Sequence, residues 1–538
     1  MVRDGDDVSR VPYPNRGPVV LPRNQALAGS GPNATMGLML DRVRYLAAAF
    51  AAVFALTGCG GSTPDILTVA IEAPPTNLDP RIGADAAAER LFELMYSFLV
   101  HRNASMELEP DLALSWETPD PTTYVFHLRD DVLFHDGRPV RAADVVYSFR
   151  SMMDGTVQTA KGAAALSLIE SIEATDSETV EIHLTEPFAP FLWNLVQIAI
   201  IPEGAGPEIA AQPIGSGPFV FDRYRVDNEI VLRRNADYFR SPPELEAVRF
   251  KIVPEAVVRG LELRKGTVDV VVNALPPDMV EVLADEPGLN VLQSPGNNYQ
   301  YLAFNLEDPL FSDVRLRQAI AYAVDRDEII EHLWRGQARP ADSVLPPENW
   351  AHNDEVDRYE YDPERARAIL DEAGYDGLSF TYRTSQDETG RLVAAVLQQQ
   401  LSEIGIRMEI RSNEFATFFA DVLGGNFQMY SLRWIGGNND PDIFEFIFHS
   451  DRVPPNGANR GRYRNPDIDR WIELARREPD RDARIAYYAD IQRTIAEDLP
   501  YVSLWYPDNV AVYSDRVEGM WLFPTGNFEF LNDVRLAQ

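Results

Sequence analysis

The chain has 538 residues, with 49 lysines and arginines against 83 aspartates and glutamates, which gives a formal net charge of −34. This acidity argues against nucleic acid and anionic membrane surfaces as partners, because both would repel it. Acidity alone does not establish a cationic ligand. Cys59 is the only cysteine, so no disulfide can form within the chain. From Cys59 onward the chain is long enough for two or three domains.

The first 58 residues carry a targeting pattern. Residues 1–35 hold scattered proline and glycine without apolar periodicity, so we expect them to be disordered and not part of the native protein. Residues 36–58 have the order of a signal peptide, with a short positive region before an apolar run of 12 residues, Tyr45 to Leu56. The run ends in Leu56-Thr57-Gly58-Cys59, which resembles the lipobox of bacterial lipoproteins. This resemblance implies that Cys59 is lipidated and becomes the new N-terminus.

Short alternating segments and turn signals dominate the chain up to about residue 300. Predicted strands cover 67–73, 124–128, 132–135, 219–224, 248–253 and 268–272, with further alternation over 171–184, and predicted helices cover 85–100 and 144–153. Asp136-Gly137 is typical of a hairpin turn. A glycine-rich turn over 214–219 leads into the strand that begins at Phe219.

The second half is more helical, and its helix ends are marked by capping residues. Predicted helices cover 315–334, 363–373, 388–404, 415–423, 466–477 and 481–497, with a strand over 406–410. Asp362-Pro363 is a typical helix start and Gly374 a typical stop. The whole indicates a mixed α/β protein.

Several motifs then occur in an order that is typical of one family. They are 132–140 (VLFHDGRPV), 143–149 (ADVVYSF), 213–219 (PIGSGPF), 303–305 (AFN), 313–320 (DVRLRQAI), 465–469 (NPDID) and 497–500 (EDLP). Taken together, they resemble the family-5 extracellular solute-binding proteins, the peptide, opine and nickel receptors of ABC importers. The resemblance covers roughly residues 65 to 538.

This resemblance implies an α/β, two-lobed periplasmic-binding-protein-like fold of class II type with an extra inserted domain. Lobe one would comprise 65–100, 205–300 and 505–538, the inserted small domain 101–204, and lobe two 301–504. The chain would cross between the lobes near 298–303 and near 500–507. Closure of the two lobes around a solute is the expected motion.

The stretch from Trp434 to Asp442 holds the side chains that a binding site uses. Trp434 offers a flat stacking face, and Gly436 and Gly437 allow a close backbone approach. Asn438, Asn439, Asp440 and Asp442 add amides and carboxylates. In peptide-binding relatives, an aspartate here holds the peptide's α-amino group, but the acid usually found three residues before Asp-Pro is Gly437 in this chain. An alternative is that Asp440 only caps the helix that follows, with Pro441 at its first position.

Three further residues are candidate ligand contacts. Arg383 lies where relatives carry an arginine for the peptide carboxylate, and the alternative is a solvated strand-end arginine. Tyr299 and Tyr506 lie near the expected crossings, where they could line the cleft, as could Tyr301. For Trp434 the alternative is a buried wall residue.

The remaining patterns give no case for an enzyme or a metal. His135-Asp136 fits a hairpin tip better than an acid–base pair, and His449 fits a helix end better than a metal ligand. The seven histidines lack metal-ligand spacing. Gly215-Ser216-Gly217 lacks the lysine of a phosphate loop, and an extracytoplasmic hydrolase would need a nucleophile and base that the sequence does not offer.

We therefore expect a lipid-anchored, monomeric cell-envelope receptor that needs no cofactor. The resemblance implies that it captures peptides, expected to be short, and delivers them to permease and ATPase subunits. The alternatives are a non-peptide solute such as a nickel chelate, opine or oligosaccharide, and a peptide-sensing receptor without transport.

Overall fold

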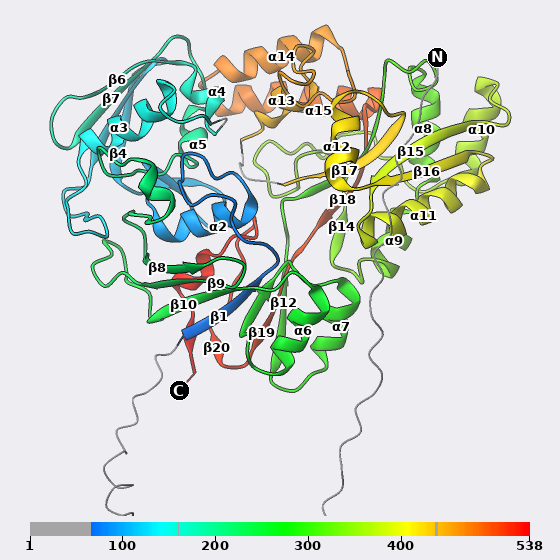
Figure 1. Ribbon diagram of the computed structural model, residues 1–538. Helices are drawn as coiled ribbons and strands as arrows, with labels where there is room; N and C mark the ends of the chain where they lie inside the picture. Colours follow the sequence, from blue (N-terminus) through cyan, green and yellow to red (C-terminus); the bar gives the residue numbers. More distant parts are fainter. Residues whose placement is uncertain (1–65, 160, 436–439, 538) are drawn as a thin grey trace, which may run out of the picture. The chain divides into compact units, whose positions relative to one another are not determined.

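The computed structural model describes residues 66–159, 161–435 and 440–537. The chain divides into two units, residues 1–62 and residues 63–538, and residues 1–35, the predicted signal peptide at 36–58 and Cys59 lie outside the described residues. Within those described ranges, no helix is both long and apolar enough to cross a membrane. The second unit is built on three main sheets (Figure 1).

A seven-stranded sheet gathers strands from both ends of this unit. Its order is β12 (Leu289–Ser294), β19 (Asn509–Ser514), β11 (Val270–Val272), β1 (Ile66–Ile71), β10 (Ala247–Ile252), β9 (Glu229–Arg234) and β8 (Phe219–Arg225). β1 runs parallel to both neighbours and is almost fully buried, as expected for a strand covered on both faces. Residues of α2 (Ala86–Met95) pack on one face, and residues of α6 (Ala256–Arg264) and α7 (Pro277–Ala284) pack on the other.

An antiparallel four-stranded sheet lies between these segments in the sequence. Its order is β4 (Ala113–Asp120), β5 (Thr123–Leu128), β7 (Thr179–Leu184) and β6 (Ile169–Ala174), with α3 (Ala142–Met153), α4 (Ala163–Leu166) and α5 (Phe191–Leu195) contributing to its core. Short elements around the two sheets are β2 (Val100–Arg102), β3 (Leu108–Pro110), β20 (Val517–Glu518), β21 (Arg535–Leu536) and the 3-10 turns η1 (Pro207–Ala210) and η2 (Glu529–Asn532).

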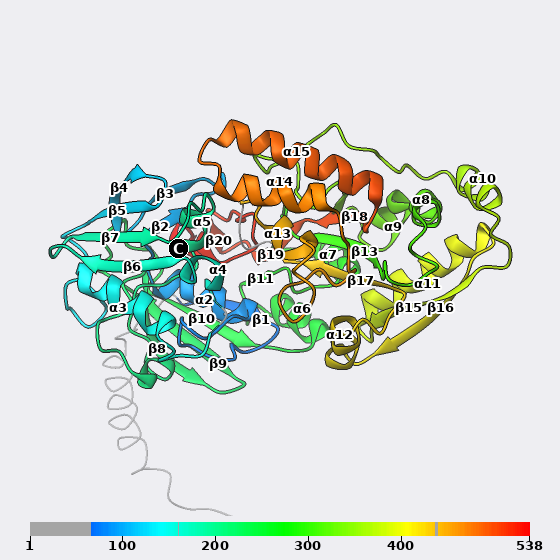
Figure 2. The ribbon, with the colours of Figure 1, turned by 90° about the horizontal axis from the view of Figure 1, so that it is seen from above.

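A six-stranded sheet forms the second half of the unit. Its order is β14 (Ala338–Pro340), β18 (Tyr501–Pro507), β13 (Tyr299–Phe304), β17 (Met429–Trp434), β15 (Ser379–Ser385) and β16 (Arg407–Asn413). One core cluster includes residues of α8 (Val314–Ala323), α9 (Arg326–His332), α10 (Pro363–Ala373) and α11 (Glu388–Glu403), and another includes α12 (Phe415–Leu423), α13 (Ile443–Phe448), α14 (Pro466–Arg477) and α15 (Arg481–Asp498). α14 and α15 run side by side (Figure 2).

The chain passes between the seven-stranded and six-stranded sheets through two short segments. One joins β12 to β13, and the other joins β18 to β19 through Asp508 alone. The two segments touch, because a Cβ on Gly296 would lie 2.4 Å from the carbonyl oxygen of Pro507. Only glycine allows the backbones to approach this closely.

Capping side chains set several helix ends as the sequence predicts. Asp85 accepts a hydrogen bond from the backbone of Ala88, and Asp362 accepts one from Arg365. Gly374 ends α10 in the left-handed conformation with φ 78°. These local signals work because each satisfies backbone groups that a helix leaves unpaired at its end.

Two predicted elements are wrong. The long helix over 315–334 is two helices, because Val324 is extended and Asp325 caps α9 by accepting from the backbone of Glu328. The strand over 132–135 forms only a single bridge, Leu133 with Pro139.

The glycine-rich turn at 214–219 is packed against the end of α2. A Cβ on Gly217 would lie 2.6 Å from the backbone carbon of Met95. His135 supports the turn, since its Nε2 lies 3.0 Å from the carbonyl oxygen of Gly217 and its Nδ1 accepts from the backbone of Gly215. His135 therefore holds two loops together at this position.

Candidate functional site

Trp434 ends β17 in a row of aromatic side chains on one face of the six-stranded sheet. It pairs across the strands with Tyr299, and its ring stacks on Tyr301 with centroids 6.3 Å apart. Tyr299 lies 5.7 Å from Tyr301 and 6.0 Å from Tyr506 between ring centroids. The fold thus brings three of the predicted residues, Trp434, Tyr299 and Tyr506, into one continuous aromatic row.

The two outer tyrosines of this row are buried and use their hydroxyls within the protein. The Tyr299 hydroxyl lies 2.8 Å from the Ser503 hydroxyl, and Tyr506 donates to the carbonyl oxygen of Leu345 at 2.9 Å. Burial raises the pKa of both phenols. Trp434 is only partly buried, so the tyrosines form a rigid wall behind it.

Asp440 is the partner of a buried arginine and not the cap of α13. The helix begins at Ile443 with Asp442 at the N-cap, so the predicted start at Asp440-Pro441 is two residues early. Nη2 of Arg484 lies 2.8 Å from each carboxylate oxygen of Asp440. The buried guanidinium draws this carboxylate inward, because an unpaired charge there would be costly.

Asp442 lies beside a second arginine. Its Oδ1 is 2.8 Å from Nε of Arg476. Burial raises the pKa of the Asp442 carboxyl to about 7 in spite of this neighbour, and the nearby Asp440 and Glu445 carboxylates add to the rise. The two acids of the predicted stretch therefore face arginines of α14 and α15.

Arg383, on β15, also has an acidic partner. Its Nη1 lies 2.6 Å from Oδ2 of Asp421 on α12, and both side chains are mostly buried. Arg383 is thus held by α12, and it pairs across the strands with Tyr430 of β17. Gly436 and Asn438 lie outside the described residues, as do Gly437 and Asn439.

Sequence reasoning missed Arg460, in the loop between α13 and α14. Its guanidinium lies 4.6 Å from the centre of the Trp434 ring and 5.2 Å from that of Phe419. Nη1 donates to the Tyr301 hydroxyl at 3.2 Å. No periodic pattern or motif marks a loop residue of this kind, so only the fold shows that its guanidinium lies over the Trp434 ring.

The six-stranded half also contacts the four-stranded domain beside this region (Figure 2). The backbone nitrogen of Ala189 donates to the carbonyl oxygen of Arg476 at 2.7 Å, and the Arg476 guanidinium lies over Phe188. Arg477 pairs with Glu186 at 3.1 Å. A cavity of about 500 Å³ lies between the same segments. Arg476 thus connects Asp442 with the four-stranded domain.

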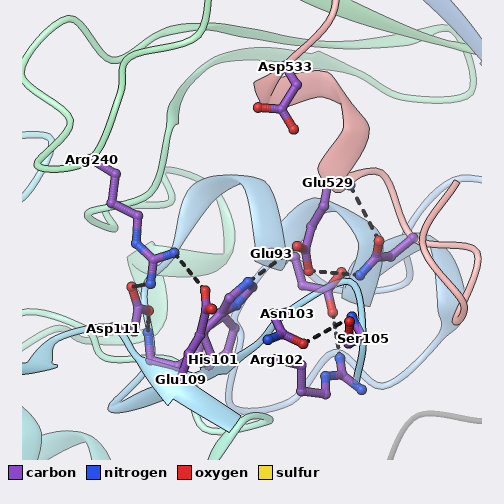
Figure 3. A network of polar contacts seen from close by, with 12 residues as sticks. Glu93, His101, Arg102, Asn103, Ser105, Glu109, Asp111, Arg240, Glu529 and Asp533 are labelled. Carbon is purple, nitrogen blue, oxygen red and sulfur yellow. Dashed lines mark hydrogen bonds and ion pairs between the residues drawn. The ribbon is translucent and has the colours of Figure 1, made fainter. Parts of the chain in front are cut away.

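A separate polar cavity of about 360 Å³ lies between α2, β2 and η2 (Figure 3). His101 faces Glu529 at 3.3 Å, and Arg102 lies 2.9 Å from Glu93. Burial and the neighbouring Glu529 raise the pKa of the Glu93 carboxyl to about 7. Four carboxylates, those of Glu93, Glu109, Asp111 and Glu529, face His101, Arg102 and Arg240, so acids outnumber cations in this network. Among the described residues, no group of three or more His, Cys, Asp or Glu side chains is placed to hold a metal ion.

Comparison with known proteins identifies the family. The profile of the bacterial extracellular solute-binding proteins, family 5, middle region, matches residues 107–453. The chain belongs to this family. The resemblance inferred from the sequence motifs is therefore confirmed.

Individual relatives align with this chain over most of their length. The dipeptide-binding protein of Escherichia coli (strain K12) is 28% identical over 517 residues, covering 89% of this chain and 96% of that protein. Di/tripeptide-binding protein 2 of Pseudomonas aeruginosa (strain UCBPP-PA14) is 31% identical over 527 residues, covering 91% and 98%.

A solved structure shows the same fold. The periplasmic binding protein DppA from Helicobacter pylori, in complex with the peptide STSA, has a TM-score of 0.75 and 29% identity, covering 88% of this chain and 98% of its own. The predicted two-lobed α/β fold class is confirmed by this likeness.

Proposed function

We propose that this family-5 protein is the solute receptor of an ABC importer and that its solutes are short peptides. Relatives that align over nearly their whole length are named for dipeptides and tripeptides, and the similar structure from H. pylori holds a peptide. The observation that carries the proposal is the aromatic row ending at the partly buried Trp434, because such a wall gives a peptide a rigid stacking surface.

The proposed receptor performs no chemistry and works by closing around its solute. Lobe one would comprise 65–100, 205–300 and 505–538, the inserted domain 101–204, and lobe two 301–504. The two chain crossings support this division, since among the described residues the chain passes between the seven-stranded and six-stranded sheets only there. A solute that touches both lobes favours the closed state.

We further propose that the protein acts as a monomer anchored in the cell envelope by lipid on Cys59, on its periplasmic or extracellular face. The apolar run followed by Leu-Thr-Gly-Cys supports this part of the proposal. The peptide would lie against Trp434, with Gly436, Asn438, Asp440, Asp442, Arg383, Tyr299 and Tyr506 as further candidate contacts or supports. Permease and ATPase subunits would be its partners.

Calorimetry with a panel of dipeptides and tripeptides tests the proposed ligand. We expect Trp434→Ala to weaken peptide binding by about 10- to 100-fold, the usual cost of losing a buried aromatic anchor. Trp434→Phe is the matched control and should keep most of the affinity, since it retains an aromatic face. Small-angle scattering should show a more compact particle with peptide.

Two results would count against the proposal. If native mass spectrometry finds a co-purified non-peptide solute and calorimetry finds no peptide binding, the receptor serves another solute class. If Trp434→Ala binds peptides as the wild type does, with unchanged melting, Trp434 does not belong to the site.

A further inference from the structure

Arg460 is one of a small group of arginines that the fold buries. Six arginines of the described chain are less than one-tenth exposed, namely Arg81, Arg102, Arg259, Arg317, Arg460 and Arg484. Arginine stays protonated in proteins, so each of these side chains brings a full positive charge out of water. Such a charge normally requires several acceptors or a carboxylate.

The other five have such partners. Arg81 pairs with Asp79 at 2.7 Å, Arg102 with Glu93 at 2.9 Å, and Arg484 with Asp440 at 2.8 Å. Arg259 donates to the carbonyl oxygens of Val253, Pro254 and Ala274, and Arg317 to those of Phe311, Asp498 and Leu499. Each of these guanidinium groups is therefore satisfied inside the fold.

Arg460 is the exception. It is 9% exposed, and the single hydrogen bond that its side chain makes to a described residue is the one to the Tyr301 hydroxyl. Its Nε is enclosed without any acceptor, and no carboxylate of the described residues lies within ion-pair distance. Four of the five N–H donors of the guanidinium thus have no described acceptor.

The surroundings of Arg460 fix its position without neutralising its charge. The guanidinium lies over the rings of Trp434 and Phe419, and cation–π contacts of this kind hold a cation in place but supply no hydrogen-bond acceptor. The neighbouring Trp434 Nε1 and the hydroxyls of Tyr430 and Tyr501 are also enclosed without hydrogen-bond partners. Several polar groups without partners therefore surround the guanidinium beside the Trp434 ring.

We propose that Arg460 is an anion-binding group of the solute site and that it receives a carboxylate of the peptide. The inference rests on the proposed function and makes it more specific. A carboxylate accepts two parallel N–H bonds from a guanidinium, and such charge-assisted pairs are strong in an enclosed site. Arg383, the arginine that the family resemblance indicates, is already held by Asp421, whereas Arg460 is, among the buried arginines of the described residues, the one with neither a carboxylate nor several carbonyl acceptors.

The carboxylate can come from the peptide's C-terminus or from an acidic side chain, and matched peptides distinguish the two. The probes are Ala-Ala-Ala against its C-terminal amide, and Ala-Glu-Ala against Ala-Gln-Ala, each titrated by calorimetry. Wild type should prefer the carboxylate member of one pair by about 10- to 100-fold, the scale of a hydrogen bond to a charged group. Arg460→Gln should remove that preference and leave the amide member within about twofold.

Two controls separate solute recognition from a structural role. Arg493→Gln removes the same charge from the surface of α15, where Arg493 pairs with Asp490 at 2.8 Å, and should leave the preference intact. Arg460→Met should melt no lower than wild type without solute, because it removes a buried charge that the fold does not compensate. A merely structural arginine would give a lower melting temperature.

Each outcome decides the inference. If wild type binds peptides without any preference for a carboxylate, or if Arg460→Gln weakens both members of a pair equally, Arg460 is not an anion receptor while the proposed function stands. If no peptide binds but acetate or succinate binds in an Arg460-dependent manner, the peptide proposal fails and the anion site stands. If neither class binds, both fail.

Discussion

Neutralising Asp440 should destabilise the protein far more than the loss of a helix cap. The side chains of Asp440 and Arg484 are 0% and 7% exposed, and Asp440→Asn leaves the guanidinium buried without its counter-charge. Breaking a buried pair in this way costs about 3–5 kcal/mol. Asparagine retains the oxygen that accepts from the backbone of Asp442 at 3.0 Å, and asparagine caps helices nearly as well as aspartate. The stability lost in Asp440→Asn therefore measures the contribution of the ion pair between Asp440 and Arg484.

A double-mutant cycle isolates this contribution. Arg484→Met alone should cost a similar amount, because it leaves the Asp440 carboxylate buried, where burial already raises its pKa. The double variant Asp440→Asn/Arg484→Met holds no charge at this position and should come within about 1 kcal/mol of wild type, since buried pairs are often replaced at little net cost. Urea unfolding with common m-values provides the comparison. Additive losses in the double variant would refute the reasoning.

Three further outcomes are expected. Gly217→Ala should lower stability by about 1–3 kcal/mol in thermal melts, because the new Cβ meets rigid backbone of α2; an unchanged melt would contradict this. Folding raises the pKa of the Glu93 carboxyl from 4.5 to about 7. The folded protein therefore holds a proton that the unfolded chain has lost, and the free energy of unfolding should fall by up to about 3 kcal/mol as the pH rises between these two pKa values. Glu93→Gln should flatten that slope, and an equal slope in both proteins would show that another group titrates. Cys59→Ser should release the protein from membranes or leave it uncleaved. If the variant is still processed and still found in the membrane fraction, the lipid anchor is ruled out.

The sequence predicts those features that depend on neighbouring residues. The caps at Asp85 and Asp362 and the stop at Gly374 satisfy backbone groups only a few residues away, so their patterns are readable without the fold. The same approach fails over 315–334, where the apolar spacing continues through the break at Val324 and hides the cap at Asp325. Periodicity reports which face is buried, and two successive helices can share that face.

The candidate site depends on residues distant in the sequence, and here local patterns mislead. Asp440-Pro441 has the composition of a helix start, but Arg484 on another helix determines where the carboxylate goes. Arg460 has no local signature at all, because its meaning arises from its contacts with Trp434 and Tyr301. The expectation that Tyr299, Tyr301 and Tyr506 lie near the chain crossings depends on the family resemblance, which indicates where those crossings fall.

The position of β19 has a consequence for how the protein is made. This strand, Asn509–Ser514, lies between β12 and β11 in the interior of the seven-stranded sheet. The sheet that begins with β1 thus lacks an interior strand until almost the whole chain has emerged from the ribosome. The six-stranded sheet has the same property, because its interior strand β18 ends only at Pro507. Long-range closure of this kind is slow, so neither of the two large sheets can be completed until synthesis of the chain is almost finished.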